Sequence, residues 1–141
     1  MAEAIEVTAT VRVPASALTV QAVRGSGPGG QNVNKVATKV ELRVDLAAIE
    51  GLTDAARSRL VALVRRRLDA EGRLLVTSQA TRFQAQNLED AREKVAALVR
   101  TALVAPVRRV KTKPTAGARH RRLEDKKRRG AVKRWRARAD D

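Results

Sequence analysis

Residues 24–35 read Arg24-Gly25-Ser26-Gly27-Pro28-Gly29-Gly30-Gln31-Asn32-Val33-Asn34-Lys35 and lie between two segments that alternate as β-strands do. Four of the six residues from 25 to 30 are glycine. Glycine reaches positive φ readily and has no Cβ, so this backbone can come close to a ligand. Gln31 then places a carboxamide at the end of the glycine run. The stretch predicts a hairpin whose loop suits chemistry done largely by the main chain.

Two familiar glycine motifs do not fit this loop. A nucleotide-binding P-loop requires the spacing G-x-x-x-x-G-K-[ST], whereas Lys35 follows the last glycine by five residues. A dinucleotide-binding fingerprint requires a surrounding βαβ unit, which the flanking segments do not form. A glycine-rich loop is also compatible with a plain hairpin turn, so glycine content alone leaves the function open.

Four segments are predicted to be β-strands, three because apolar residues alternate in them and the fourth because it is short, partly β-branched and follows Gly72. The first is residues 5–13, which Pro14 ends. The others are residues 18–23, 40–45 and 74–77. The glycine-rich loop therefore connects the second strand to the third.

A helix is predicted between the third and fourth strands, with Thr53 as its N-cap and Gly72 as its stop signal. Its apolar residues at helical spacing are Ala56, Leu60, Leu63, Val64 and Leu68. The opposite face carries Arg57, Arg59, Arg65, Arg66 and Arg67. We interpret these arginines as a solvated helix face, with contact to RNA as the second alternative.

A second helix is predicted from about Asn87, with Asp90 three residues later completing a capping box. Its apolar face is Leu88, Ala91, Val95, Leu98, Val99 and Ala102. This face should pack on the sheet. The predicted fold class is therefore α+β, with a small, mostly antiparallel sheet packed by two helices.

The charge is concentrated in the last quarter of the chain. Lys and Arg total 30 and Asp and Glu total 15, for a net charge of +15, and residues 106–141 alone carry +11. Such an excess is the electrostatic signature of a nucleic-acid partner. We predict a domain over residues 1–105, a basic linker over 106–117 and a polycationic tail over 118–141. The tail should be disordered alone and become helical on an anionic surface.

Composition argues against several classes of function. The chain has no cysteine, so it has no disulfide or thiolate zinc site, and this fits the cytoplasm as its expected location. The single histidine, His120, makes neither a metal site nor a Ser–His catalytic set, and no cofactor is expected. No stretch is long and apolar enough to span a bilayer, so no membrane partner is expected.

Other chemistry-bearing residues have simpler interpretations. The acidic pairs Glu89-Asp90 and Glu124-Asp125 are better explained by capping and charge balance than by acid–base catalysis. The chain has two aromatic residues, Phe83 and Trp135, which is too few for a base-stacking platform. We interpret Trp135 as a minor anchor in the tail.

The whole string from Arg24 to Lys35 resembles the signature of the catalytic domain of peptide-chain release factors, in which Gly-Gly-Gln is followed by Val-Asn-Lys. A second stretch, with Gln79, Arg82, Gln84 and Asn87, is similar to that family's Gln-x-x-Arg-x-Gln-x-x-Asn. Phe83 departs from the family pattern, where serine is usual. The resemblance covers roughly residues 18–104.

A short chain with a basic tail is more similar to one branch, the alternative ribosome-rescue factor B family. The resemblance implies a codon-independent hydrolase of the peptidyl-tRNA ester, acting on the ribosome as a monomer without a cofactor. Its implied catalytic residues are Gly29, Gly30 and Gln31, with the backbone N–H of Gln31 as oxyanion donor. The implied residues that support the loop are Arg24, Gly27, Pro28, Asn32, Asn34 and Lys35.

The implied partners are peptidyl-tRNA, ribosomal RNA, the peptidyl-transferase centre and the mRNA entry channel. The resemblance places the tail in that channel when it is empty, and the expected tail contacts are Arg108, Arg109, Lys111, Lys113, Arg121, Arg122, Lys126, Lys127, Arg129 and Lys133. Two alternatives remain open at this point. One is a non-catalytic ribosome- or rRNA-binding protein of the same fold, and the other is a nonspecific DNA or membrane-surface binder.

Overall fold

The computed structural model describes residues 2–25 and 36–139. The chain divides into two compact units, Met1–Pro106 and Val107–Asp141, which we describe separately. The described parts contain no helix with both the length and the apolar character needed to cross a membrane.

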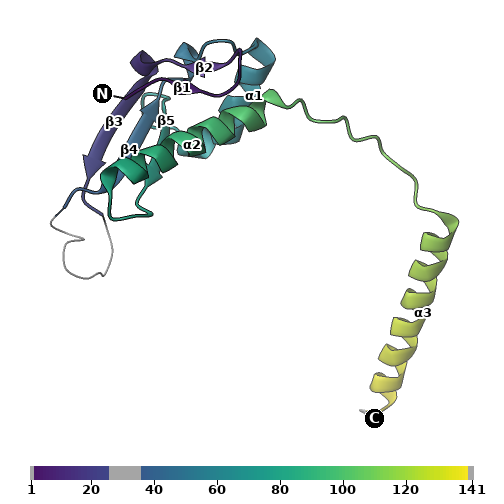
Figure 1. Ribbon diagram of the computed structural model, residues 1–141. Coiled ribbons are helices and arrows are strands. Elements are labelled where there is room, and N and C mark those ends of the chain that lie inside the picture. Colours follow the sequence, from purple (N-terminus) through teal and green to yellow (C-terminus); the bar gives the residue numbers. More distant parts are fainter. Residues whose placement is uncertain (1, 26–35, 140–141) are drawn as a thin grey trace. The chain divides into compact units, whose positions relative to one another are not determined.

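The first unit is built on a three-stranded antiparallel sheet in the order β3-β4-β5 (Figure 1). Its strands are β3 (Leu18–Val23), β4 (Lys39–Val44) and β5 (Leu74–Ser78). The sequence predicted all three strands, and their alternation explains the sheet. Val40, Leu42 and Val44 are fully buried, whereas Lys39, Glu41 and Arg43 lie on the other face and pair with one another.

The register aligns the apolar side chains of the three strands on one face. Leu42 pairs with Val20 of β3 and with Val76 of β5. Because side chains on a strand alternate between faces, Leu42 and Val44 each lie beside apolar neighbours on both sides, whereas Val40 lies between Ala22 and Ser78. The sheet therefore has one face that helices must cover.

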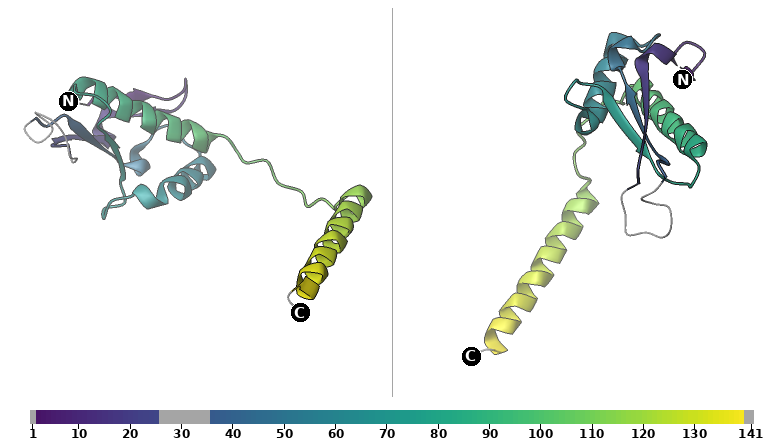
Figure 2. Two further views of the ribbon diagram at one scale, coloured as in Figure 1. Left: turned by 90° about the horizontal axis from the view of Figure 1, so that it is seen from below. Right: turned by 90° about the vertical axis from the view of Figure 1, so that its left-hand side faces the viewer.

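Two helices supply that cover (Figures 1 and 2). α2 (Gln84–Leu103) lies across the sheet and contacts β4 and β5, and α1 (Asp54–Val64) packs against α2. The predicted N-cap of α1 is confirmed, because the Ala56 backbone N–H donates to Thr53 Oγ1 at 3.2 Å. The core joins Leu60 and Val64 of α1 to Val95 and Val99 of α2, all fully buried. The α+β fold, with two helices on a small antiparallel sheet, is confirmed.

The prediction of one strand over residues 5–13 is wrong. Two short strands, β1 (Ile5–Glu6) and β2 (Arg12–Val13), pair with each other antiparallel instead. The chain reverses between them because the Thr8 hydroxyl accepts hydrogen bonds from the backbone N–H groups of Thr10 (3.3 Å) and Val11 (3.1 Å). A threonine that bonds its own backbone competes with a continuous strand.

The end of α1 also differs from the prediction. The α-helix ends at Val64 and continues only as a 3₁₀ turn over Arg65–Arg67, so Leu68 lies outside it, and Leu63 is 48% exposed. Gly72 does not end this helix. It lies in the tight turn before β5, at φ +77°, where its N–H donates to the Asp69 carbonyl at 3.0 Å.

The second unit contains α3 (Ala116–Ala139), preceded by residues 107–115, which form neither helix nor strand. α3 begins two residues before the predicted tail, and Gly130 does not interrupt it. Its side chains are almost all exposed, and none is buried. The prediction that this segment is disordered alone therefore differs from the structure, in which residues 116–139 are helical without a buried side chain.

Candidate functional site

The predicted catalytic segment belongs to the connection between β3 and β4. Gly27, Pro28, Gly29, Gly30, Gln31, Asn32, Asn34 and Lys35 fall within residues 26–35, which lie outside the described residues. The structure does describe how the two ends of this segment join the sheet. Val23 and Lys39 form the last pair of the β3–β4 ladder, and Arg24 follows Val23 with an exposed side chain.

Asn87 holds the chain just before β4. It is fully buried, and its Nδ2 donates to the carbonyl oxygens of Thr38 (2.7 Å) and Thr81 (3.0 Å). Its Oδ1 accepts from the backbone N–H of Thr81 (2.9 Å) and lies 3.1 Å from the Thr81 hydroxyl. The carboxamide thus uses its full bonding capacity and ties the loop after β5 to the start of β4.

The prediction that Asn87 caps the second helix is therefore wrong. α2 begins three residues earlier, at Gln84, and Phe83 is its N-cap residue. Asn87 lies inside the first turn, where its backbone N–H donates to the Phe83 carbonyl at 3.1 Å. Its side chain is unavailable for capping because Thr38 and Thr81 already bind it.

Asp90, the predicted second half of the capping box, also contacts the sheet instead. Its carboxylate accepts from the Ser78 hydroxyl and from Lys94 Nζ, each at 2.6 Å. The Lys94 hydrogen bond, followed by the Ser78 hydrogen bond, lowers the pKa of Asp90. Ser78 is the last residue of β5, so Asp90 fixes the same end of the unit as Asn87.

The other residues of the motif that contains Asn87 precede it in the chain. Gln79, Arg82 and Gln84 lie in the turn after β5 and at the first position of α2, and all three are exposed. Phe83 is 65% exposed. The Gln-x-x-Arg-x-Gln-x-x-Asn motif thus lies where β5 ends and α2 begins, and its Asn87 bonds Thr38 at the start of β4.

The interpretation of Arg57, Arg59 and Arg65–Arg67 as a solvated helix face is wrong for the two arginines that lie in α1. Arg59 Nε donates to the Ala102 carbonyl at 2.8 Å, at the end of α2. Arg57 donates to the carbonyl oxygens of Leu46 and Ile49. These guanidinium groups satisfy carbonyls that are distant in sequence, whereas Arg65, Arg66 and Arg67 are exposed as predicted.

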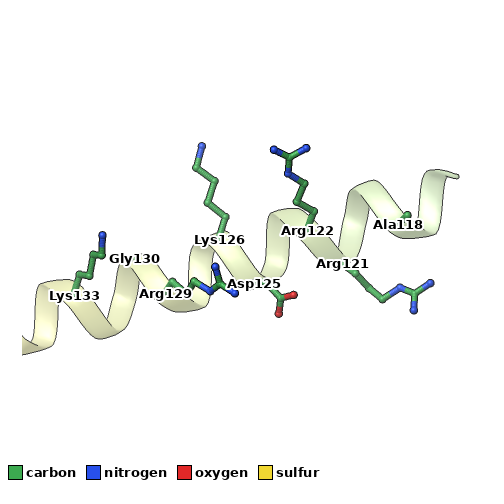
Figure 3. Close-up of a pocket in the computed structure, with 8 residues that line it drawn as sticks. All are labelled: Ala118, Arg121, Arg122, Asp125, Lys126, Arg129, Gly130 and Lys133. Atoms are coloured by element: carbon green, nitrogen blue, oxygen red, sulfur yellow. The ribbon is translucent and has the colours of Figure 1, made fainter. Parts of the chain in front are cut away.

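The predicted tail contacts divide between two segments. Arg108, Arg109, Lys111 and Lys113 lie in residues 107–115, and the other six lie on α3. Figure 3 shows that Arg122, Lys126 and Lys133 project from the same side of the helix, and that Asp125 points away from them. The two acids of α3 are each engaged locally, Asp125 with Arg128 (2.6 Å) and Glu124 with His120 (3.2 Å). These contacts support charge balance as the role of this acidic pair.

α3 carries 11 Lys and Arg residues and those two acids. A helix with this excess of charge and no buried side chain is suited to a polyanionic surface. Within the described ranges, no cluster of three His, Cys, Asp or Glu residues could hold a metal ion.

Comparison with known proteins supports the resemblance. The family model described as "RF-1 domain" matches residues 5–138. "Peptidyl-tRNA hydrolase ArfB" of Pseudomonas putida is 40% identical over 81 residues, which are 57% of this chain and 58% of that protein. "Large ribosomal subunit protein mL62" of Mus musculus is 36% identical over 78 residues, 55% of this chain and 38% of that protein.

Both alignments cover less than two thirds of either protein, so these relatives are similar to part of this chain. The family model, in contrast, extends over the sheet, both covering helices and nearly all of α3. On this evidence, the chain belongs to the RF-1 domain family, as the Gly-Gly-Gln signature had indicated.

Proposed function

We propose that this protein is a ribosome-dependent, codon-independent hydrolase of peptidyl-tRNA, which releases the nascent peptide from ribosomes stalled on messages without a stop codon. The observation that carries the proposal is the sequence Gly29-Gly30-Gln31 in the β3–β4 connection of an RF-1 domain. The similarity to a protein named peptidyl-tRNA hydrolase supports the same substrate class.

The proposed chemistry needs few side chains. The peptidyl-tRNA ester is already activated, so the loop must admit one water molecule, orient it and stabilise the oxyanion that forms. Backbone N–H groups aimed at developing negative charge supply such stabilisation. We assign this donation to the backbone N–H of Gln31, and the positioning of water to its side chain. The tRNA ribose and the ribosome supply the proton transfers.

The described part of the unit supports this assignment through its rigidity. Reactive groups must be held within a fraction of an ångström of their working positions, and sites on rigid elements meet that demand best. The β3–β4 ladder continues to the pair Val23 and Lys39, and Asn87 holds Thr38 beside it. Both ends of the Gly-Gly-Gln segment therefore start from fixed positions.

The basic second unit is proposed to detect the absence of message. Its lysines and arginines would bind the RNA walls of the empty mRNA entry channel through phosphate contacts and counterion release, without reading bases. A message already in the channel would compete for the same phosphates. Binding of the tail to the empty channel would thereby select stalled ribosomes without recognition of a codon.

The direct test adds purified protein to ribosomes stalled at the 3′ end of a message without a stop codon and measures released peptide. Wild-type protein should release it, and Gly30→Ala should abolish release while ribosome binding persists. Gly117→Ala is the matched control, because a Cβ at Gly117 would meet no atom within 4 Å. If wild-type protein binds these ribosomes and releases nothing, the enzymatic proposal fails.

A second candidate function is a non-catalytic component of the ribosome, which the similarity to "Large ribosomal subunit protein mL62" favours. The two candidates differ in turnover. A hydrolase releases peptide from many ribosomes per molecule, whereas a structural component remains bound in a one-to-one ratio. Release measured with a tenfold excess of stalled ribosomes separates them.

A further inference from the structure

Phe83 has a side chain that the packing of the first unit does not explain. It is the sole aromatic residue of residues 1–106, yet it is 65% exposed and takes no part in the hydrophobic core. Burying a phenylalanine side chain removes a large apolar area from water and stabilises a fold. An exposed Phe forgoes much of that stabilisation, so its presence here calls for a role other than folding.

The backbone of Phe83 is nevertheless held firmly. Its N–H donates to Thr81 Oγ1 at 3.2 Å, and its carbonyl accepts from the Asn87 N–H at 3.1 Å. The Thr81 hydroxyl also lies 3.1 Å from the Phe83 carbonyl. Because the backbone is already ordered, binding a partner through the ring would cost the freedom of the side chain alone.

The same bonds place Phe83 close to Thr38, which precedes β4 and follows the Gly-Gly-Gln segment in the chain. Asn87 links the turn that carries Phe83 to Thr38, immediately before β4. Figure 1 shows the turn between β5 and α2 at the end of the sheet where β3 ends and β4 begins. Phe83 therefore belongs to the end of the sheet from which the β3–β4 connection leaves.

The charge around Phe83 selects the kind of partner. Arg82 precedes it and is exposed, and the next acids along the chain, Glu89 and Asp90, are paired with Arg92 and Lys94. Unpaired RNA bases stack on aromatic rings, while a neighbouring arginine binds phosphate or stacks in turn. Exposed carboxamides at Gln79, Gln84 and Gln86 add groups that can bond a base edge.

We propose that Phe83 stacks on an unpaired RNA base next to the site of ester hydrolysis, and that Arg82 contacts the adjoining phosphate. This inference rests on the proposed function, because it assigns part of the RNA recognition of that same site. The base belongs either to the acceptor end of the tRNA or to ribosomal RNA. Both offer the same chemistry, and the experiment below separates them.

The first experiment replaces Phe83 in the full chain and measures peptide release as a function of protein concentration. Stacking on one base is worth about 1–3 kcal/mol, so Phe83→Ser should raise the concentration for half-maximal release roughly tenfold. Phe83→Tyr should stay near wild type, and Phe83→Leu should behave like Phe83→Ser. Val104→Ser is the matched control, because Val104 is an exposed apolar residue (71%) at the other end of α2.

Salt dependence distinguishes the two contacts. Loss of one phosphate contact should reduce the slope of log affinity against log salt by about one in Arg82→Gln, whereas the Phe83 variants should leave the slope unchanged. Release by Phe83→Ser at the wild-type concentration would overturn the proposal. So would equal activity of Phe83→Leu and Phe83→Tyr, which would indicate an apolar protein partner. A lower melting temperature of Phe83→Ser than of Val104→Ser would assign Phe83 to folding.

A photocrosslinking experiment tests contact with RNA without requiring release. p-Benzoylphenylalanine at position 83 should label RNA in stalled ribosomes, and the same group at position 104 should not. Mapping the label to tRNA or to ribosomal RNA identifies the source of the base. Labelling by a protein that releases no peptide would refute the proposed function and keep the stacking contact. Release without any RNA label would support the proposed function and refute the stacking contact.

Discussion

The Nδ2 group of Asn87 donates a 2.7 Å hydrogen bond to the carbonyl oxygen of Thr38, which lies 49 residues earlier in the chain. Asn87 is fully buried and belongs to the first turn of α2, whereas Thr38 immediately precedes β4. A buried carboxamide with all its bonds made specifies one arrangement of the segments it joins. This bond connects the helix that covers the sheet to the segment that carries Gly-Gly-Gln.

Asn87→Asp tests this connection with almost no change in shape. An aspartate cannot donate to the carbonyls of Thr38 and Thr81, and each buried group left unsatisfied costs about 1–3 kcal/mol. We expect the free energy of unfolding, measured in urea, to fall by about 2–4 kcal/mol and peptide release to fall with it. The control is Gln86→Glu, an exposed carboxamide in the same turn. Equal stability of the two variants would contradict the anchoring role.

Two glycines with positive φ should respond differently to alanine. Gly51 (φ +82°) and Gly72 (φ +77°) share a left-handed conformation that strains other residues, but a Cβ at Gly51 would also clash with the Thr10 carbonyl oxygen, and one at Gly72 would meet nothing within 4 Å. Gly72→Ala should therefore lose only about 1–2 kcal/mol of unfolding free energy. Gly51→Ala should lose about 4 kcal/mol or more. Urea unfolding of both variants compares them, and similar losses would refute the clash.

Asp69 should make the first unit sensitive to acid. The pKa of Asp69 is lowered from 3.8, above all because its carboxylate accepts the backbone N–H of Arg73, at 2.8 Å. A group whose pKa is depressed in the folded state stabilises the fold above its unfolded pKa and loses this effect as pH falls through the folded value. Wild type should exceed Asp69→Asn in stability at pH 6, and the difference should shrink below pH 3.8. Thermal unfolding across pH 2–7 measures it, and a constant difference would contradict the assignment.

Arg59 should stabilise the end of α2. Its Nε donates to the Ala102 carbonyl at 2.8 Å, in the last turn, where helix carbonyls lack partners within the helix. A hydrogen bond from a charged donor contributes about 1.5–3 kcal/mol, so Arg59→Ala should lose about that much unfolding free energy. Arg66→Ala, at an exposed arginine, is the control and should change little. Hydrogen exchange of the amides in the last turn of α2 should quicken in Arg59→Ala alone.

The basic second unit should control binding to the stalled ribosome. Truncation after Ala105 should abolish release on stalled complexes and flatten the salt dependence of binding. A finer variant replaces Arg122, Lys126 and Lys133, which project from one side of α3 (Figure 3), with glutamine. It should reduce the slope of log affinity against log salt by about 2–3. Glu124→Gln removes an opposing charge and should not weaken binding. Full activity of the truncated chain would refute detection of an empty channel.

Local patterns determined much of this protein. The strands β3 and β4 follow from alternation within their own residues, β5 follows from a short apolar, partly β-branched run, and Thr53 caps α1 through an N–H three positions away. The Gly-Gly-Gln signature led to the family directly. The basic composition of the last 36 residues predicted a tail that is disordered alone, whereas the structure has a helix there that buries no side chain. These features depend on neighbours in sequence, where short-range rules apply.

Tertiary structure alone decided the roles of Asn87, Asp90 and Arg59. From the sequence, Asn87 and Asp90 have the three-residue spacing of a capping box, and Arg59 lies on a polar helix face. Their hydrogen-bond partners are Thr38, Ser78 and Ala102, which are 49, 12 and 43 residues away. A polar side chain bonds whichever buried group the fold brings to it, because an unsatisfied buried group is costly. Helical periodicity and capping rules describe one segment at a time and contain no information about which distant carbonyl will need a donor.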